Sequence, residues 1–159
     1  MPHSMRRKNA WFLTASLLSL FVLTSVAQTG RDAGVQKRKP VLITRLYTGA
    51  DGQTHAEEIE TKFTAGNPNE VFKMGTAGAE LHRAAPGTVI DWHTAPRRQY
   101  VITLSGQGEL EVSGGNKIPV GPGHIELVED TTGKGHITRV TGTEDRVTLT
   151  LPLADQSSR

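Results

Sequence analysis

From Val41 onward the chain alternates between short apolar segments and turns that contain glycine or proline. The apolar segments are rich in Val, Ile, Thr and Leu, residue types that favour strands. No segment there shows a sustained helical period between capping residues. We therefore predict an all-β domain with strands at 41–47, 56–63, 70–75, 79–84, 88–93, 98–105, 108–113, 117–120, 124–129, 135–140 and 146–152. Many short strands at such close spacing are typical of a sandwich or a small barrel.

The predicted strand at 98–105 carries apolar side chains on both of its faces. Val101 and Thr103 share one face with Gln99, because successive side chains of a strand alternate. The opposite face consists of Tyr100, Ile102 and Leu104. A strand with two apolar faces needs cover on both. We consider two covers for the second face: another part of the same chain, or a second copy in a homodimer.

The N-terminal 27 residues follow a different pattern. A basic stretch at 5–8 precedes an apolar run at 10–26, and the small residues Ser25 and Ala27 stand at its end. This order is typical of a secretory signal peptide that is cleaved after Ala27. An uncleaved membrane anchor is the alternative, since the apolar run has the shortest length that spans a bilayer. We predict export to the periplasm or the cell exterior, with membrane contact only through an uncleaved leader.

Length, charge and cysteine content narrow the picture further. A chain of 159 residues without an internal repeat has room for one core. We divide it into a signal peptide (1–27), a flexible lead-in (28–40), a barrel domain (41–153) and a tail (154–159). Because the chain contains no cysteine, no disulfide stabilises the exported fold. Three of the 18 basic residues lie in the leader, which leaves 15 against 16 acidic residues and no basic surface for nucleic acid.

Glycines and histidines recur at regular distances in the second half of the chain. Five residues separate Gly87 from His93, and six residues separate Gln99 from Gly106. Further on, His136 follows a glycine at a distance of three positions. A lone pair of this kind is a weak signal, whereas the combination is specific.

These spacings resemble the two sequence motifs of the cupin superfamily. The segments "DWHTAPRRQYV", "GPGH" and "EDTTGKGHITRV" are similar to those of small single-domain bacterial cupins, and the resemblance covers most of Val41 to Leu153. It implies an all-β, cupin-type jelly-roll barrel. It also implies that the two motifs lie on neighbouring strands and converge inside the mouth of the barrel.

The chain departs from the family motif at several ligand positions. Ala95 stands where the motif has a second histidine, and Gln99 stands where it has a glutamate. Carried over residue by residue, the metal-ligand positions of the family are His93, Gln99 and His136. Two imidazoles and an amide oxygen suit a divalent first-row metal such as Mn, Fe, Ni or Zn, but no ligand is anionic. The alternative is a metal-free pocket in which Gln99 bridges the two histidines by hydrogen bonds.

Two further residues of the first motif are candidates for the pocket. Trp92 either stacks on a flat ligand or packs in the core or an interface. Arg97 has the parity of His93 and Gln99 and is placed to meet a carboxylate, although Pro96 interrupts the strand. Arg98 should then face away. The predicted ligand pocket consists of Trp92, His93, Arg97, Gln99 and His136.

We assign structural roles to other polar residues near the motifs. Asp130 either orients a histidine or caps the "DTTG" turn, and we favour the turn. Lys134 is interpreted as an exposed loop lysine rather than a cation that reaches the pocket. The glycines of "GQG" and "GPG" are interpreted as hairpin-turn residues. The histidines outside the motifs are interpreted as surface or structural residues: His55, His82 and His124.

Three classes of function remain open for this chain. The first is an exported small-molecule-binding module whose pocket is centred on His93, Gln99 and His136. The second is a metal-dependent enzyme of the dioxygenase, lyase or isomerase kind, with the same residues as ligands. The third is a structural dimer with a vestigial pocket. The absence of cysteine and of a Gly-x-Ser-x-Gly elbow argues against nucleophilic hydrolysis, and no catalytic residue is assigned.

Overall fold

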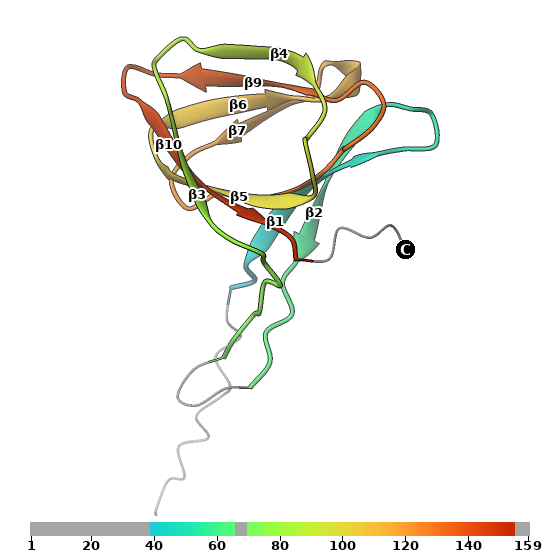
Figure 1. Ribbon diagram of the computed structural model, residues 1–159, viewed down its shortest axis with the longest axis vertical. Helices are drawn as coiled ribbons and strands as arrows, with labels where there is room; N and C mark the ends of the chain where they lie inside the picture. Colours follow the sequence, from blue (N-terminus) through green and yellow to red (C-terminus); the bar gives the residue numbers. More distant parts are fainter. Residues whose placement is uncertain (1–38, 66–69, 155–159) are drawn as a thin grey trace, which may run out of the picture. The chain divides into compact units, whose positions relative to one another are not determined.

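The computed structural model describes residues 39–65 and 70–154, which form two facing sheets (Figure 1). The six-stranded sheet has the order β2-β1-β8-β5-β10-β3, and the four-stranded sheet has the order β4-β9-β6-β7. The strands are β1 (Leu42–Thr48), β2 (Thr54–Glu60), β3 (Glu80–Ala84), β4 (Val89–His93), β5 (Gln99–Ser105), β6 (Gln107–Glu111), β7 (Lys117–Val120), β8 (Ile125–Glu129), β9 (His136–Thr141) and β10 (Arg146–Pro152). The prediction of an all-β fold is confirmed. The predicted signal peptide lies outside the described residues.

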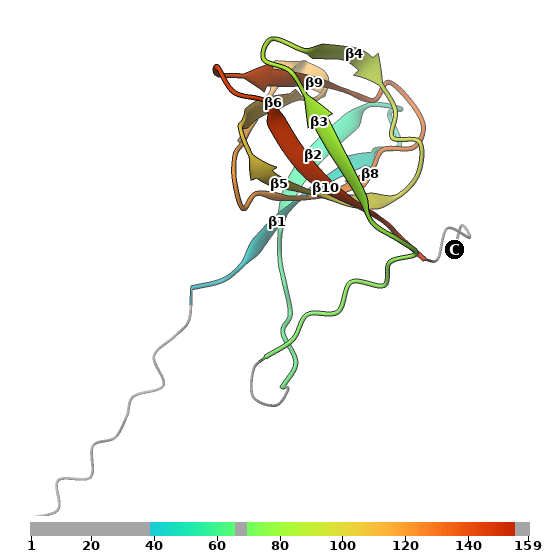
Figure 2. The same ribbon diagram turned by 60° about the vertical axis from the view of Figure 1, so that its left-hand side comes forward.

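Strand pairing brings distant parts of the sequence together. β1 pairs with β8 in parallel, and the other strand pairs are antiparallel. In the larger sheet, β3 runs beside β10 at one edge (Figure 2). In the smaller sheet, β4 and β9 are neighbours, so the two predicted motifs do lie on adjacent strands.

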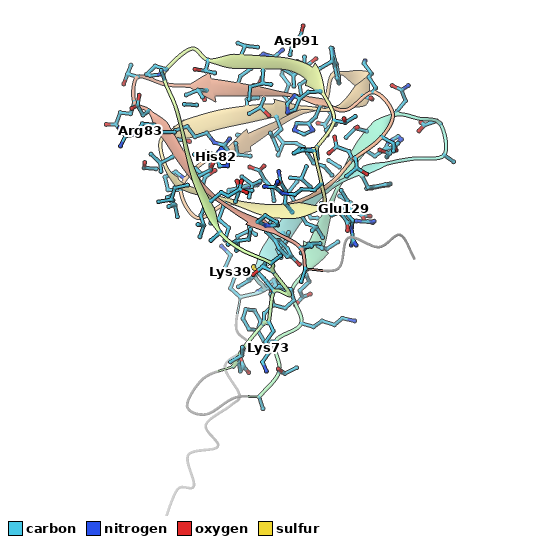
Figure 3. All side chains as sticks on the ribbon, viewed as in Figure 1. Lys39, Lys73, His82, Arg83, Asp91 and Glu129 are labelled. Atoms are coloured by element: carbon cyan, nitrogen blue, oxygen red, sulfur yellow. The ribbon has the colours of Figure 1, made fainter. Side chains whose placement is uncertain are left out.

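Side chains fill the space between the sheets (Figure 3), and one of the two apolar clusters of the described residues lies there. Its buried members come from both sheets: Leu46, Ala95, Leu110, Val112, Val120 and Val128. Alternation explains the pattern in β6, where Leu110 points inward while Glu109 and Glu111 pair with Arg139 on the opposite face. Burial of this apolar surface is the main stabilising contribution to the fold.

The second cluster covers the outer face of the six-stranded sheet. Ile43, Tyr100 and Leu127 are buried there, and Phe72 and Met74 pack against them. Another part of the same chain therefore covers Tyr100, which is the first of the two alternatives considered for this face. The homodimer stays a prediction.

The predicted strand at 70–75 is wrong. This segment makes only isolated bridges to the rest of the described chain, between Thr64 and Val71 and between Thr76 and Leu153. Its apolar residues alternate as they would in a strand, but they pack on the face of a sheet instead of pairing at its edge. The described residues contain no helix long and apolar enough to cross a membrane.

Candidate functional site

His93 and His136 lie side by side at the junction of β4 and β9. The two residues are register partners, their ring centroids are 4.4 Å apart, and the rings are inclined at 54°. The register shifts between Ile90 and His93, which turns His93 towards its partner. Gly135 allows the close approach of the two strands, because a Cβ atom there would lie 2.0 Å from the carbonyl oxygen of His93. Its φ of +76° is also one that glycine adopts readily.

Hydrogen bonds at Nδ1 fix the orientation of both imidazole rings. The Nδ1 atom of His136 is 2.7 Å from Oδ2 of Asp130, which is fully buried and also accepts a hydrogen bond from Thr54. The Nδ1 atom of His93 donates to the carbonyl oxygen of Asp91 at 2.8 Å. With the Nδ1 proton held by these acceptors, the Nε2 atom of a neutral ring carries a lone pair for a ligand. The interpretation of Asp130 as a turn cap is therefore wrong, because its carboxylate orients a histidine.

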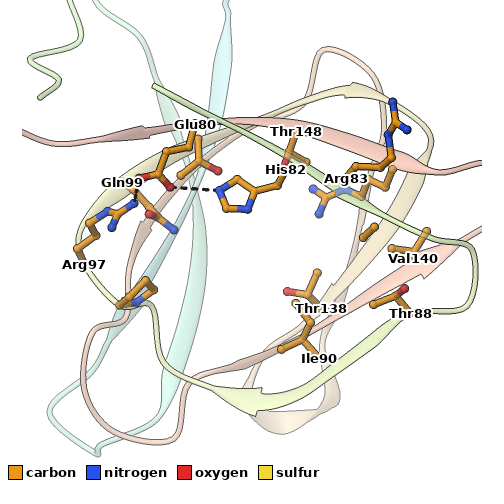
Figure 4. A pocket seen from close by; sticks show the side chains of 14 residues that line it. Glu80, His82, Arg83, Thr88, Ile90, Arg97, Gln99, Thr138, Val140 and Thr148 are labelled. Carbon is orange, nitrogen blue, oxygen red and sulfur yellow. Dashed lines mark hydrogen bonds and ion pairs between the residues drawn. The ribbon is translucent and has the colours of Figure 1, made fainter. Parts of the chain in front are cut away.

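A cavity of about 520 Å³ lies between the two sheets (Figure 4). One wall comes from β3 and β10, and the other comes from β4 and β9. The lining combines apolar groups with polar ones, as small-molecule sites do. It includes His82, Ile90, Arg97, Gln99, Thr138, Val140, Arg146, Thr148 and Thr150.

Arg97, Glu80 and His82 form a linked cluster on one side of this cavity (Figure 4). Arg97 donates from Nη2 to Oε1 of Glu80 at 2.5 Å, and Nε2 of His82 lies 3.2 Å from the other carboxylate oxygen. Arg98 points the other way and pairs with Glu129, so the predicted parity of the two arginines is confirmed. His82 is exposed, as predicted for a surface residue, and it also lines the cavity.

Two predicted pocket residues carry polar atoms without partners. Nε of Arg97 and Oε1 of Gln99 are buried and form no hydrogen bond within residues 39–65 and 70–154. Buried polar atoms are nearly always satisfied by protein, water or ligand. These two atoms are therefore placed to be satisfied by something that enters the cavity.

Arg146 is a buried member of the cavity wall that sequence analysis did not single out. Only 7% of its surface is exposed, and its Nη2 atom donates to Thr103 at 2.8 Å and to Glu126 at 2.9 Å. Burial raises the pKa of Glu126 above its ordinary value, and the charges of Arg146 and His136 offset part of that rise. The sequence signal was Gly108, a glycine inside β6 that leaves room for the arginine.

Trp92 takes part in a contact outside this cavity. The ammonium group of Lys134 lies 3.7 Å from the centroid of the indole ring, which is a cation–π geometry. Lys134 is exposed, as predicted for a loop residue. The stacking of a flat ligand on Trp92 stays a prediction.

The structure thus divides the five predicted pocket residues into groups. Arg97 and Gln99 line the cavity, whereas Trp92, His93 and His136 are not among its lining residues. In the part of the chain that the structure describes, no three His, Cys, Asp or Glu side chains form a group that could hold a metal. A single site that unites both histidines with Gln99 stays a prediction.

Comparisons with known proteins concern the fold. No protein-family model and no curated protein match the sequence. A conserved protein with a double-stranded β-helix domain from Klebsiella pneumoniae is 19% identical with a TM-score of 0.41, over 55% of this chain and 76% of that chain. A Cupin 2 conserved barrel domain protein from Leptotrichia buccalis is 20% identical with a TM-score of 0.39, over 58% and 39%. An RmlC-like cupin protein from Desulfovibrio desulfuricans is 20% identical with a TM-score of 0.36, over 52% and 76%.

These solved structures are cupin and double-stranded β-helix proteins, the superfamily that the sequence resembles. All three TM-scores are below 0.5, so this likeness carries no argument about function. The function has to be argued from the cavity and the histidine pair.

Proposed function

We propose that the protein binds a small molecule in the cavity between its two sheets. The observation that carries this proposal is the cavity of about 520 Å³, whose wall includes Arg97 and Gln99 with buried, unpartnered polar atoms. Cavities of this size that combine apolar lining with a few convergent polar groups are typical ligand sites. His93 and His136 belong to the proposed site as a second polar group of the barrel interior.

A matched pair of variants on β4 tests this proposal. Ile90 lines the cavity, and Val89 points to the opposite side of the same strand, although both are about half exposed. Ile90→Trp should fill part of the cavity, whereas Val89→Trp should leave it open. Ligand-observed NMR against a library of neutral and charged small molecules should find ligands that bind the wild type and Val89→Trp but not Ile90→Trp. Ligands that bind all three proteins equally would show that binding occurs outside the cavity. If no molecule of the library binds the wild type at millimolar concentration, the proposal is refuted.

The second candidate is a metal-dependent enzyme, and the pairing of His93 with His136 favours it. Their ring centroids are 4.4 Å apart, and both Nδ1 atoms are engaged, so each Nε2 is available as a ligand. Gln99 would supply an amide oxygen, because its Oε1 atom is buried without a partner in the described residues. This donor set fits a divalent first-row ion (Mn, Fe, Ni or Zn) weakly, since no donor is anionic. Such an ion would act as a Lewis acid.

Metal titration distinguishes the second candidate from the first. Gln99→Glu should tighten binding of Mn²⁺, Ni²⁺ or Zn²⁺ by at least about tenfold, because it adds an anionic ligand without lengthening the side chain. His136→Ala should abolish this gain. Gln107→Glu is the matched control, since it adds the same charge at an exposed position beside Thr141, at the other end of β9 from His136. If Gln99→Glu binds these ions no better than the wild type, the three side chains do not share a metal site.

The proposal includes export, which rests on the basic, apolar and small-residue order of the N-terminus. Cleavage after Ala27 would leave a mature chain that begins at Gln28. The intact mass of protein recovered from the cell envelope tests this point. A mass that retains residues 1–27 would instead indicate a membrane-anchored protein.

A further inference from the structure

Arg146 holds a charge inside the barrel with few partners. A guanidinium group has five N–H donors. In the described chain, the hydrogen bonds of Arg146 are the two from Nη2 to Thr103 and Glu126, and Nε is buried without a partner. Burying a charge is costly unless it is paired and hydrogen-bonded. The N–H groups of Arg146 that form no hydrogen bond in the described chain are therefore available to an acceptor in the cavity.

The backbone around Arg146 makes room for this side chain. The register of β10 and β5 shifts just after it, between Val147 and Thr148. On the facing strand, a Cβ atom at Gly108 would lie 3.0 Å from Cδ and Nε of Arg146. A glycine inside a strand weakens it, so its position beside a buried arginine is informative. The register shift of β10 and the glycine in β6 therefore both lie where Arg146 enters the interior.

The cavity wall combines arginine donors with an apolar surface. Three arginines line it, and each has a carboxylate partner in the described chain: Arg83 with Asp145, Arg97 with Glu80 and Arg146 with Glu126. Arg146 is the buried one of the three. Ile90 and Val140 supply apolar surface, and Thr148 and Thr150 supply methyl and hydroxyl groups. An arginine with free N–H donors binds a carboxylate through charge-assisted hydrogen bonds.

We propose that the cavity binds a small organic carboxylate whose carboxylate group accepts hydrogen bonds from Arg146. The apolar body of this ligand lies against Ile90 and Val140. The inference rests on the proposed function of the cavity as a small-molecule site and adds the ligand class and its anchoring residue. Neither the cupin-like motifs nor the histidine pair includes Arg146.

The rival explanation is a purely structural ion pair between Arg146 and Glu126. Under that explanation the cavity has no preference for acids over neutral molecules of the same shape. Pairs of matched probes separate the two explanations. We choose trans-cinnamate with cinnamamide and hexanoate with hexanamide, because each pair differs in charge while its apolar body is the same.

Calorimetric titration of the purified protein with both pairs should show that each acid binds at least about tenfold more tightly than its amide, the factor expected for one charge-assisted hydrogen bond. Arg146→Gln should remove this difference. Arg139→Gln is the matched control, since Arg139 pairs with Glu109 and Glu111 on the outer face of the four-stranded sheet. It should retain the difference.

A spectroscopic readout in the wild type covers the case in which Arg146→Gln fails to fold. The buried Nε–H of Arg146 should give a side-chain NMR signal that shifts when trans-cinnamate binds and does not shift with cinnamamide. The Nε–H signal of Arg146 is assigned by its absence from the spectrum of Arg146→Lys, a variant that keeps the charge.

Three results would overturn this inference in different ways. Amides that bind as tightly as the acids would refute the ligand class and leave the cavity as a binding site. If Arg97→Gln loses the preference for acids while Arg146→Gln retains it, the carboxylate is held by Arg97 and not by Arg146. If none of the four probes binds, while library ligands still bind the cavity and are excluded by Ile90→Trp, the carboxylate class is also refuted.

Discussion

Two glutamates on β8 face opposite sides of the same sheet and have opposite environments. Glu129 lies on the outer face, where Arg45 donates to one carboxylate oxygen at 2.6 Å and Arg98 donates to the other. Burial opposes ionisation of Glu129, but these hydrogen bonds hold its pKa below the ordinary value. Glu126 lies on the inner face with Arg146, and burial raises its pKa.

The hydrogen-bond partners of the two glutamates differ, and we interpret the cluster at Glu129 as structural and the cluster at Glu126 as a candidate functional group. On the outer face, two arginines satisfy one carboxylate near solvent, and nothing there is left unpaired at Glu129. On the inner face, one arginine meets one carboxylate away from water, and its Nε has no partner in residues 39–65 and 70–154. Incomplete satisfaction beside a cavity is what a ligand would complete.

Removing the inner carboxylate should have the largest effect on stability. Glu126→Leu leaves Arg146 buried without its counter-charge, which costs about 3 to 5 kcal/mol. The double variant with Arg146→Met should recover most of this loss, because both charges are then gone. Urea denaturation measures both free energies of unfolding. Glu129→Leu is the outer-face control, and an equal loss in that variant would contradict the difference between the two faces.

Narrowing the space around Arg146 should have the next largest effect. In Gly108→Ala the new Cβ would lie 2.9 Å from the carbonyl oxygen of Arg139 and would press on Arg146. We expect a loss of about 1 to 3 kcal/mol in the free energy of unfolding, together with weaker binding of trans-cinnamate. Gly78→Ala is the control, because its Cβ would have no neighbour within 4 Å. Unchanged stability in Gly108→Ala would show that the arginine does not need this glycine.

Neutralising the outer carboxylate should have a smaller effect. Arg45 and Arg98 are partly exposed, with side-chain exposures of 35% and 44%, so solvent weakens their pairing with Glu129. We expect Glu129→Gln to lower the free energy of unfolding by about 1 kcal/mol or less, measured by urea denaturation. Added salt should reduce this difference. A loss as large as that of Glu126→Leu would mean that the outer cluster is the more important one.

The pH dependence of stability should give the smallest difference, and its sign separates the two glutamates. The lowered pKa of Glu129 adds stability above its ordinary value of 4.5, and this contribution is lost as the pH falls through the folded-state pKa. The raised pKa of Glu126 acts in the opposite direction, so its contribution is present below 4.5 and is lost as the pH rises through the folded-state pKa.

Urea denaturation of variants across pH 3 to 8 measures these contributions. Glu129→Gln should flatten the acidic part of the stability profile, and Glu126→Gln should flatten the part above 4.5. Identical profiles for the two variants would contradict the assignment of opposite environments.

Strand alternation made much of the fold and part of the site predictable from sequence. The opposite directions of Arg97 and Arg98 followed from parity alone, in spite of Pro96. The resemblance to the cupin motifs implied that His93 and His136 lie on neighbouring strands, as they do. The first inference depends on local periodicity, which a sequence carries directly, and the second depends on the family resemblance.

Features that depend on tertiary packing could not be predicted in the same way. Segment 70–75 has the pattern of a strand, yet Phe72 and Met74 pack on a sheet face. Gly108 was interpreted as a turn residue because the bulk of Arg146 facing it is not visible in the sequence. The place of His82 in the cavity wall was not predicted for a related reason, since it depends on the pairing of β3 with β10.

A crystal structure of the wild-type protein soaked with trans-cinnamate would show whether the barrel interior, with Arg146 at its wall, is a carboxylate site. We expect the ligand to lie between the two sheets with its carboxylate within hydrogen-bond distance of Arg146. A cinnamate bound at Arg45 and Arg98 on the outer face, with no ligand in the interior, would refute the proposed site.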